Sequence, residues 1–130
     1  IIGIDLIDLD LVEGVRIYNQ DIRDHAAVNK IFIDKDMPLD LVLSDIAPNI
    51  TGISDIDQSN FSEIALTILG FCKSNLRPNG TMIMKYFLGS GFDETLNMLN
   101  NYFKKISVFK PASSKKKSNE VYLICIDFKD

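Results

Sequence analysis

A lysine within an apolar segment is the first side chain in this sequence that could do chemistry. Lys85 lies in residues 82–87, whose composition is typical of a buried strand. Burial lowers the pKa of a lysine unless carboxylates compensate, and Asp45 and Glu120 are the natural compensators. A lysine held in this way can accept a proton from a sugar hydroxyl or orient that hydroxyl. A strand-end lysine that reaches water has only a structural role, and from this residue alone both interpretations stay open.

Aspartates at the ends of predicted strands are the next candidates. Asp5 ends the apolar residues 1–4 and could accept hydrogen bonds from a ribose, as acids in nucleotide-binding sheets do. Asp21 could likewise meet an adenine amino group. One aspartate at a strand end is more often a turn or cap residue, so the set carries more weight than its members. Because ligands bind at the carboxyl ends of parallel strands, we expect Asp5, Asp21, Asp45 and Lys85 to converge on one cleft.

Alternating strand-like and helix-like segments predict the elements that position these residues. Strands are expected over residues 1–5, 15–18, 39–44, 81–87, 106–109 and 121–127, and helices over residues 25–33, 61–75 and 92–103. We expect Asp24 and Asp93 to cap helices, residues 49–60 to form a polar loop, and residues 77–80 to form a turn. The nearly continuous apolar strand over residues 39–44 indicates cover on both faces. The pattern predicts an α/β domain with a mostly parallel sheet and an antiparallel edge formed by the last two strands.

Length and composition fit one ordinary globular domain. The chain has 130 residues, 46% hydrophobic and 25% charged, which is enough to bury a core of its own. No apolar run approaches the roughly 18 to 20 residues that cross a bilayer, and no signal-peptide pattern opens the chain, so we expect a cytoplasmic protein without a membrane partner. Cys72 and Cys125 are expected to be reduced core residues. Because His25 is the single histidine, we expect no metal site and no Ser-His-Asp triad.

The charges are distributed unevenly along the chain. Residues 1–60 hold 12 Asp and Glu against 4 Lys and Arg, whereas residues 61–130 hold 6 against 10. Between Asn101 and Ser118 the sequence has no acidic residue and six lysines, namely Lys104, Lys105, Lys110, Lys115, Lys116 and Lys117. Such a cluster suits a polyanion such as nucleic acid, although solvated lysines are also common on protein surfaces.

A specific family resemblance joins these observations. The segment Ser44-Asp45-Ile46-Ala47-Pro48-Asn49 resembles the Ser-Asp-Met-Ala-Pro-Asn motif of FtsJ-type (RrmJ) 2′-O-methyltransferases of large-subunit ribosomal RNA. Further segments are similar to that family in order and spacing, and they are residues 5–6, 14–15, 20–24, 84–87, 91–94, 110–114 and 118–122. The resemblance covers essentially the whole chain.

The resemblance implies a Rossmann-like methyltransferase fold that binds S-adenosylmethionine and methylates a ribose 2′-hydroxyl with a Lys-Asp-Lys-Glu tetrad. Asp45, Lys85 and Glu120 match three tetrad members, and Asp5, Asp21 and Asp45 match cofactor contacts. Lys85 is by resemblance the proton acceptor of an in-line displacement, in which the 2′-oxygen attacks the sulfonium methyl while Lys85 takes or positions the proton. The implied partner is ribosomal RNA or the large ribosomal subunit, contacted through the lysines by a monomer.

Two family features are missing from these residues. The first tetrad lysine and the glycine-rich cofactor loop belong to a segment before Ile1 in the family, and neither occurs in this chain. The same segment supplies a central strand, flanked by the strands that end at Asp5 and Asp45. We therefore expect residues 1–130 to be the C-terminal portion of a catalytic domain, catalytically incomplete as it stands.

Two other interpretations remain beside the methyltransferase. Residues 38–52 are similar to the phosphorylation strand and loop of a phosphoacceptor receiver domain, in which Asp45 would be phosphorylated and Asp5 and Asp8 would help to hold magnesium. A receiver leaves residues 113–122 unexplained. The second alternative is a non-catalytic domain that binds RNA or protein through its lysines, and the missing cofactor loop favours it.

Overall fold

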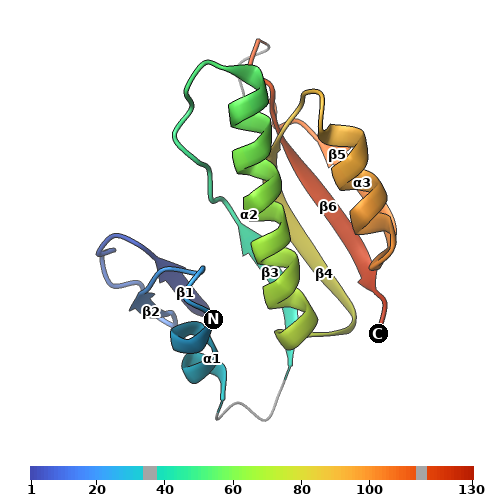
Figure 1. Ribbon diagram of the computed structural model, residues 1–130. Coiled ribbons are helices and arrows are strands. Elements are labelled where there is room, and N and C mark those ends of the chain that lie inside the picture. The colour runs from blue at the N-terminus through green and yellow to red at the C-terminus, as the bar shows by residue number, and fades with distance from the viewer. Residues whose placement is uncertain (34–37, 114–116) are drawn as a thin grey trace. The chain divides into compact units, whose positions relative to one another are not determined.

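The computed structural model describes residues 1–33, 38–113 and 117–130. The chain forms two compact units, residues 1–37 and residues 38–130, and each is described by itself (Figure 1). Two of the predicted RNA-binding lysines, Lys115 and Lys116, lie outside the described residues. None of the helices in the described part of the chain is long and apolar enough to cross a membrane.

The first unit contains two strands and one helix. Strands β1 (Ile2–Asp5) and β2 (Arg16–Asn19) pair in parallel, from Ile2 opposite Arg16 to Asp5 opposite Asn19. Helix α1 (His25–Phe32) begins after Asp24, whose carboxylate accepts a hydrogen bond from the backbone N–H of Ala27 at 3.1 Å. The three predicted elements and the Asp24 cap are confirmed.

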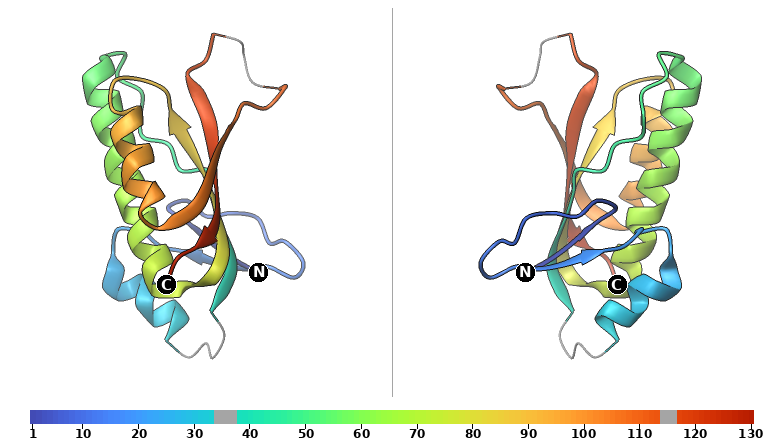
Figure 2. Two further views of the ribbon diagram at one scale, coloured as in Figure 1. Left: turned by 90° about the vertical axis from the view of Figure 1, so that its right-hand side faces the viewer. Right: turned by 90° about the vertical axis from the view of Figure 1, so that its left-hand side faces the viewer.

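The second unit is a four-stranded sheet in the order β3-β4-β6-β5. Its strands are β3 (Leu39–Ser44), β4 (Leu76–Phe87), β5 (Phe103–Phe109) and β6 (Glu120–Phe128). Strands β3 and β4 are parallel, whereas β6 is antiparallel to both β4 and β5, so the predicted antiparallel edge is confirmed. Helices α2 (Ser54–Asn75) and α3 (Phe92–Asn100) lie on the same face of this sheet (Figure 2).

The core lies between that face and the two helices. Alternate residues of β4, namely Met82, Met84 and Tyr86, are buried, and they stand opposite Cys125, Leu123 and Val121 of β6. Helix α2 adds Phe61, Ala65, Ile68, Leu69 and Cys72. Both cysteines are buried and free, as predicted, and burial raises the pKa of each thiol to about 12. The alternation places Lys85 on the opposite face from Met84 and Tyr86.

Helix α2 begins earlier than predicted, at Ser54, so the prediction of a loop throughout residues 49–60 is wrong. The reason is Asp57, which is buried and accepts hydrogen bonds from the Thr51 backbone N–H and hydroxyl, both at 2.8 Å, and from the Gly52 N–H at 3.2 Å. These bonds connect the preceding loop to the first turns of the helix. They also hold the pKa of the Asp57 carboxyl below its usual value, with the Thr51 backbone bond as the main cause.

Two smaller predictions also need correction. Residues 77–80 belong to β4, where the pairing with β3 shifts from Leu39 opposite Leu76 to Leu41 opposite Thr81. The turn signal therefore marks an irregularity within a strand. Helix α3 begins after Gly91 without a side-chain cap, so Asp93 lies in its first turn and does not cap it.

Strand β3 is covered on one face only. Val42 and Ser44 are buried, whereas Leu41 is 47% exposed and Leu43 is 67% exposed. The predicted cover on both faces is therefore wrong for the described residues of this unit, because helices α2 and α3 pack on the same side of the sheet.

Candidate active site

The carboxyl ends of β3 and β4 and the start of β6 meet at one end of the four-stranded sheet (Figure 1). Asp45 directly follows β3, and Lys85 lies two residues before the end of β4. Tyr122, the third residue of β6, stands directly opposite Lys85 in the β4–β6 pairing. Parallel pairing on one side of β4 and antiparallel pairing on the other thus bring three side chains from three strands together.

These three side chains make direct polar contacts through one oxygen atom. Lys85 Nζ lies 3.0 Å from Asp45 Oδ1, and the Tyr122 hydroxyl donates a hydrogen bond to the same oxygen at 2.7 Å. The Lys85 side chain is 18% exposed, whereas the Asp45 side chain is 71% exposed. The site therefore consists of a shielded ammonium group beside an exposed carboxylate.

The electrostatics of this site favour the charged forms of Lys85 and Asp45. The hydrogen bond with Asp45 is the main cause that raises the pKa of Lys85, and the charges of Asp45 and Glu120 add to it against the effect of burial. The hydrogen bond from Tyr122 is the main cause that lowers the pKa of Asp45. Burial acts in the opposite direction, and the hydrogen bond with Lys85 and its charge lower the pKa further. The predicted compensation of burial by carboxylates is confirmed, and near neutral pH the pair is an ammonium and a carboxylate.

Glu120 lies at the same end of the sheet as this pair. It is the first residue of β6, opposite Phe87, and its backbone N–H donates to the Ser118 hydroxyl at 3.2 Å. Its charge raises the pKa of Lys85. Asp45 and Lys85 are thus in direct contact, whereas Glu120 acts on Lys85 through its charge.

Gln58 of α2 fixes the segment that follows Lys85. Its side-chain amide donates to the Phe87 carbonyl at 2.7 Å and accepts from the Gly91 N–H at 3.1 Å. A β-carbon at Gly89 would lie 2.5 Å from Gln58 Nε2, so a side chain there would displace the Gln58 amide. The end of β4 and the start of α3 are therefore connected through one buried amide.

Asp5 and Asp21 belong to the first unit. Asp5 is half-buried at the end of β1, and its Oδ1 accepts from the Ile7 N–H at 3.1 Å. The Asp21 carboxylate accepts hydrogen bonds from the Arg23 backbone N–H at 2.9 Å and from Arg23 Nη2 at 2.8 Å. The hydrogen bond from the Arg23 side chain is the main cause that lowers the pKa of Asp21. The shared cleft with Lys85 stays a prediction.

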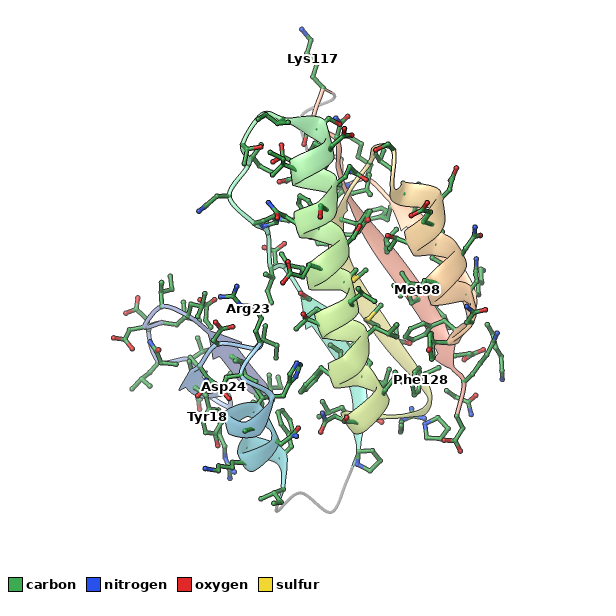
Figure 3. All side chains as sticks on the ribbon, in the orientation of Figure 1. Tyr18, Arg23, Asp24, Met98, Lys117 and Phe128 are labelled. Carbon is green, nitrogen blue, oxygen red and sulfur yellow. The ribbon has the colours of Figure 1, made fainter. Side chains whose placement is uncertain are left out.

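The predicted RNA-binding lysines that the structure describes form two groups, one at each end of β5. Lys104 and Lys105 lie near its start, and Lys104 donates to Asn79 at 3.3 Å. Lys110 follows the end of β5, roughly 20 Å further along the strand direction, and donates to the Ser118 carbonyl. Lys117 is exposed and its side chain points away from the sheet at the same end as the candidate site (Figure 3).

Comparison with known proteins decides the family. A family model described as FtsJ-like methyltransferase matches residues 1–128. The chain belongs to the FtsJ-like methyltransferase family. Its α/β fold is therefore the Rossmann-like methyltransferase fold that the sequence resemblance implied. The family match includes residues 113–122, which a receiver domain leaves unexplained, so the receiver interpretation is set aside.

Individual FtsJ-like methyltransferases show the extent of the similarity. The chain is 35% identical over 127 residues to ribosomal RNA large subunit methyltransferase E of Methylobacillus flagellatus, covering 95% of this chain and 60% of that protein. The protein of the same name from Bordetella parapertussis is 35% identical, with coverage of 99% and 62%. A solved structure described as a ribosomal RNA methyltransferase from Plasmodium falciparum is 30% identical, with a TM-score of 0.85 and coverage of 98% and 71%. The chain thus spans about 60% of the length of these two curated relatives.

Sequence reasoning missed Tyr122 as a member of the site. It lies within the family-like segment 118–122, where the resemblance assigns it no role of its own. Its position depends on the alternation of side chains along β6, which the sequence can show, and on the pairing of β6 with β4, which it cannot. The alternation in β6 puts residues 120 and 122 on one face, and the pairing with β4 then places Tyr122 opposite Lys85.

Proposed function

We propose that this protein transfers a methyl group from S-adenosylmethionine to a ribose 2′-hydroxyl of large-subunit ribosomal RNA. The observation that carries the proposal is the Lys85–Asp45 contact of 3.0 Å at the strand ends of an FtsJ-like methyltransferase chain. The names of the relatives, ribosomal RNA large subunit methyltransferase E, support RNA as the substrate.

The residues of the first unit fit the proposed cofactor chemically. A ribose diol and an adenine amino group present hydrogen-bond donors, and ionised carboxylates are pure acceptors. Asp5 uses Oδ1 for the Ile7 N–H and retains further acceptor capacity at the end of β1. Asp21 is held in place by Arg23, and its oxygens keep lone pairs for another donor. When bound, the cofactor supplies an electrophilic methyl group.

Lys85 and Asp45 would act on the hydroxyl that receives the methyl group. The proton of that hydroxyl passes to solvent water as the oxygen takes the methyl group, and a neighbouring ammonium eases this loss by stabilising negative charge on the oxygen. The raised pKa of Lys85 favours this orienting role over the role of proton acceptor, because an ammonium must lose its own proton before it can take another. Asp45 keeps the ammonium aimed at one position through the shared Oδ1 contact.

Ribosomal RNA would be held partly by lysines. Lys110 and Lys117 lie at the same end of the sheet as Lys85 and are the described lysines best placed for phosphates of the substrate strand. Lys104 and Lys105 would meet a more distant part of the RNA. The family's glycine-rich loop and first tetrad lysine do not occur in residues 1–130. We propose that the reaction needs both, with this chain as the C-terminal portion of the catalytic domain.

The experiment that tests this function measures methyl transfer from labelled S-adenosylmethionine to large-subunit ribosomal RNA by the full-length protein. Lys85→Ala is expected to lower transfer by about a hundredfold or more, because it removes a group that acts on the reacting oxygen. The affinity of this variant for the cofactor, measured by calorimetric titration, should stay within about twofold of the wild type. A twofold change in Kd is a small change in binding free energy, well below the roughly 1.4 kcal/mol of a tenfold change.

Lys73→Ala is the matched control, because Lys73 lies in the last turn of α2 over the Tyr102 ring, away from the strand ends. It should retain full transfer. Equal activity of the Lys85→Ala variant and the wild type would remove Lys85 from the proposed role. Cofactor and RNA binding by a wild type without transfer would support the non-catalytic RNA-binding alternative instead.

A further inference from the structure

We propose that Tyr122 is a positioning residue of the methyl-transfer site, whose hydroxyl holds the Asp45 carboxylate against the Lys85 ammonium. The inference rests on the proposed function and adds to it a residue outside the family's tetrad. The Tyr122 hydroxyl donates to Asp45 Oδ1 at 2.7 Å, the same oxygen that lies 3.0 Å from Lys85 Nζ.

The Asp45–Lys85 pair needs an external anchor. Asp45 follows β3 in a loop and its side chain is 71% exposed, so little packing restricts the carboxylate. Lys85 reaches it through a flexible four-carbon chain. An ion pair with one exposed partner gains only modest Coulomb attraction, and ordering two mobile side chains offsets part of it. A third group is therefore needed to keep the ammonium at one position.

Tyr122 has the properties of such an anchor. Its ring has two rotatable bonds and stands on β6, which is paired on both sides, with β4 and with β5. The β4–β6 register places it directly opposite Lys85. Because β4 lies between β3 and β6 in the sheet, the hydrogen bond to Asp45 spans three strands and fixes the carboxylate relative to the strand that carries Lys85.

The electrostatics agree with this arrangement. The hydrogen bond from Tyr122 is the main cause that lowers the pKa of Asp45, and the bond in turn raises the pKa of the Tyr122 phenol. The phenol therefore stays protonated and keeps donating at neutral pH. The contacts of Asp45 with Lys85 and Tyr122 both use Oδ1, and Oδ2 has acceptor capacity for a further donor.

The chain contains a matched control tyrosine. Tyr86, the next residue along β4 from Lys85, is fully buried, and its hydroxyl shares hydrogen bonds with Thr95 at 2.7 Å and Ser62 at 3.1 Å. It lies on the helix-covered face of the sheet, opposite to the face of Lys85. Removing the hydroxyl of Tyr86 tests packing, whereas removing that of Tyr122 tests positioning.

The experiment compares Tyr122→Phe and Tyr86→Phe in the full-length protein. For Tyr122→Phe we expect kcat to fall about tenfold, which corresponds to one lost positioning hydrogen bond, with KM for RNA within about twofold and an unchanged melting temperature. Tyr86→Phe should lower the melting temperature and leave kcat unchanged. The pKa of Asp45, followed by carbon NMR of its carboxyl group, should rise in Tyr122→Phe and stay constant in Tyr86→Phe.

Three results would overturn the proposal. Unchanged kcat in Tyr122→Phe would show that Asp45 needs no anchor, and a raised KM with unchanged kcat would show that Tyr122 binds RNA directly. An unchanged pKa of Asp45 would show that the hydrogen bond is not formed in solution. If even the wild type transfers no methyl group, the proposed function fails, and the NMR titration alone then decides whether Tyr122 positions Asp45.

Discussion

Lys85 carries its proton because two carboxylates outweigh its partial burial. Desolvation alone would push its pKa down, but the hydrogen bond with Asp45 and the charges of Asp45 and Glu120 raise it above the usual 10.5. Asp45 is affected in the opposite direction, and its carboxyl pKa falls below 3.8. Both groups therefore stay charged over the whole interval between these two values.

The pH dependence of methyl transfer follows from these shifts. Between about pH 6 and pH 10 the ammonium role predicts a flat kcat, because neither Lys85 nor Asp45 titrates there and the substrate hydroxyl loses its proton to water only as the methyl group is transferred. If neutral Lys85 were required as proton acceptor, kcat would increase about tenfold with each pH unit over the same interval. The measurement is a pH profile of kcat under saturating substrates, and a flat profile supports the ammonium role. A slope of one is shared by a neutral Lys85 beside a hydroxyl and by an ammonium beside an already ionised hydroxyl, so it does not decide alone.

Lys85→Arg is the companion variant, since arginine stays protonated at every accessible pH. Under the ammonium role it should keep measurable transfer, whereas as a proton acceptor it would be inactive. A slope of one in the pH profile together with an inactive arginine variant would restore the role that the family resemblance assigns to Lys85.

At the scale of elements, the sequence predicted best where local patterns decide. The continuous apolar run of β3 gave its bounds as Leu39–Ser44, and helix α1 followed its Asp24 cap. The first turns of α2 were missed, because residues such as Asp57 and Gln58 have the polarity of a loop. Their burial depends on Thr51 and on the segment after β4, and this distant contact has no local signature.

The candidate site shows the same division. Lys85 and Asp45 could be predicted from composition and motif, since a lysine within an apolar strand requires a carboxylate partner. The contact of Tyr122 with Asp45 depends on the pairing of β6 with β4, and the two residues are 77 positions apart. No periodicity within one segment specifies such a register, so this part of the site required the structure.

Gln58 provides a prediction at this scale. Gln58→Ala removes a buried amide that bonds the Phe87 carbonyl and the Gly91 N–H, and leaves both backbone groups without their partner. We expect the free energy of unfolding to fall by about 2 kcal/mol. Gln20→Ala, at the other glutamine, should change it by less than about 0.5 kcal/mol. Urea denaturation of both variants checks this, and equal stability of Gln58→Ala and the wild type would show that the amide does not hold this segment.

At the scale of the whole molecule, the charge asymmetry along the sequence matches a division between two proposed roles. The acidic residues 1–60 hold the aspartates proposed for the cofactor, and the basic residues 61–130 hold the lysines proposed for RNA. Within the second unit, Lys110 and Lys117 share the end of the sheet that carries Lys85, while Lys104 and Lys105 lie at the other end of β5.

The salt dependence of RNA binding tests this division. Affinity for ribosomal RNA should fall as salt rises, and Lys117→Ala should reduce the slope of log K against log salt by about one phosphate contact. Lys129→Ala is the control, because Lys129 bonds the Asn100 carbonyl near the chain's end. A slope that Lys117→Ala leaves unchanged would exclude this lysine from the RNA contact.

The position of the transferred methyl group tests the proposed reaction most directly. Large-subunit ribosomal RNA incubated with the full-length protein and S-adenosylmethionine is digested to nucleosides and analysed by mass spectrometry. We expect a methyl group on a ribose, absent from a parallel reaction with Lys85→Ala. A methyl group on a base, or a ribose methyl group formed equally by the Lys85→Ala variant, would contradict the proposed reaction.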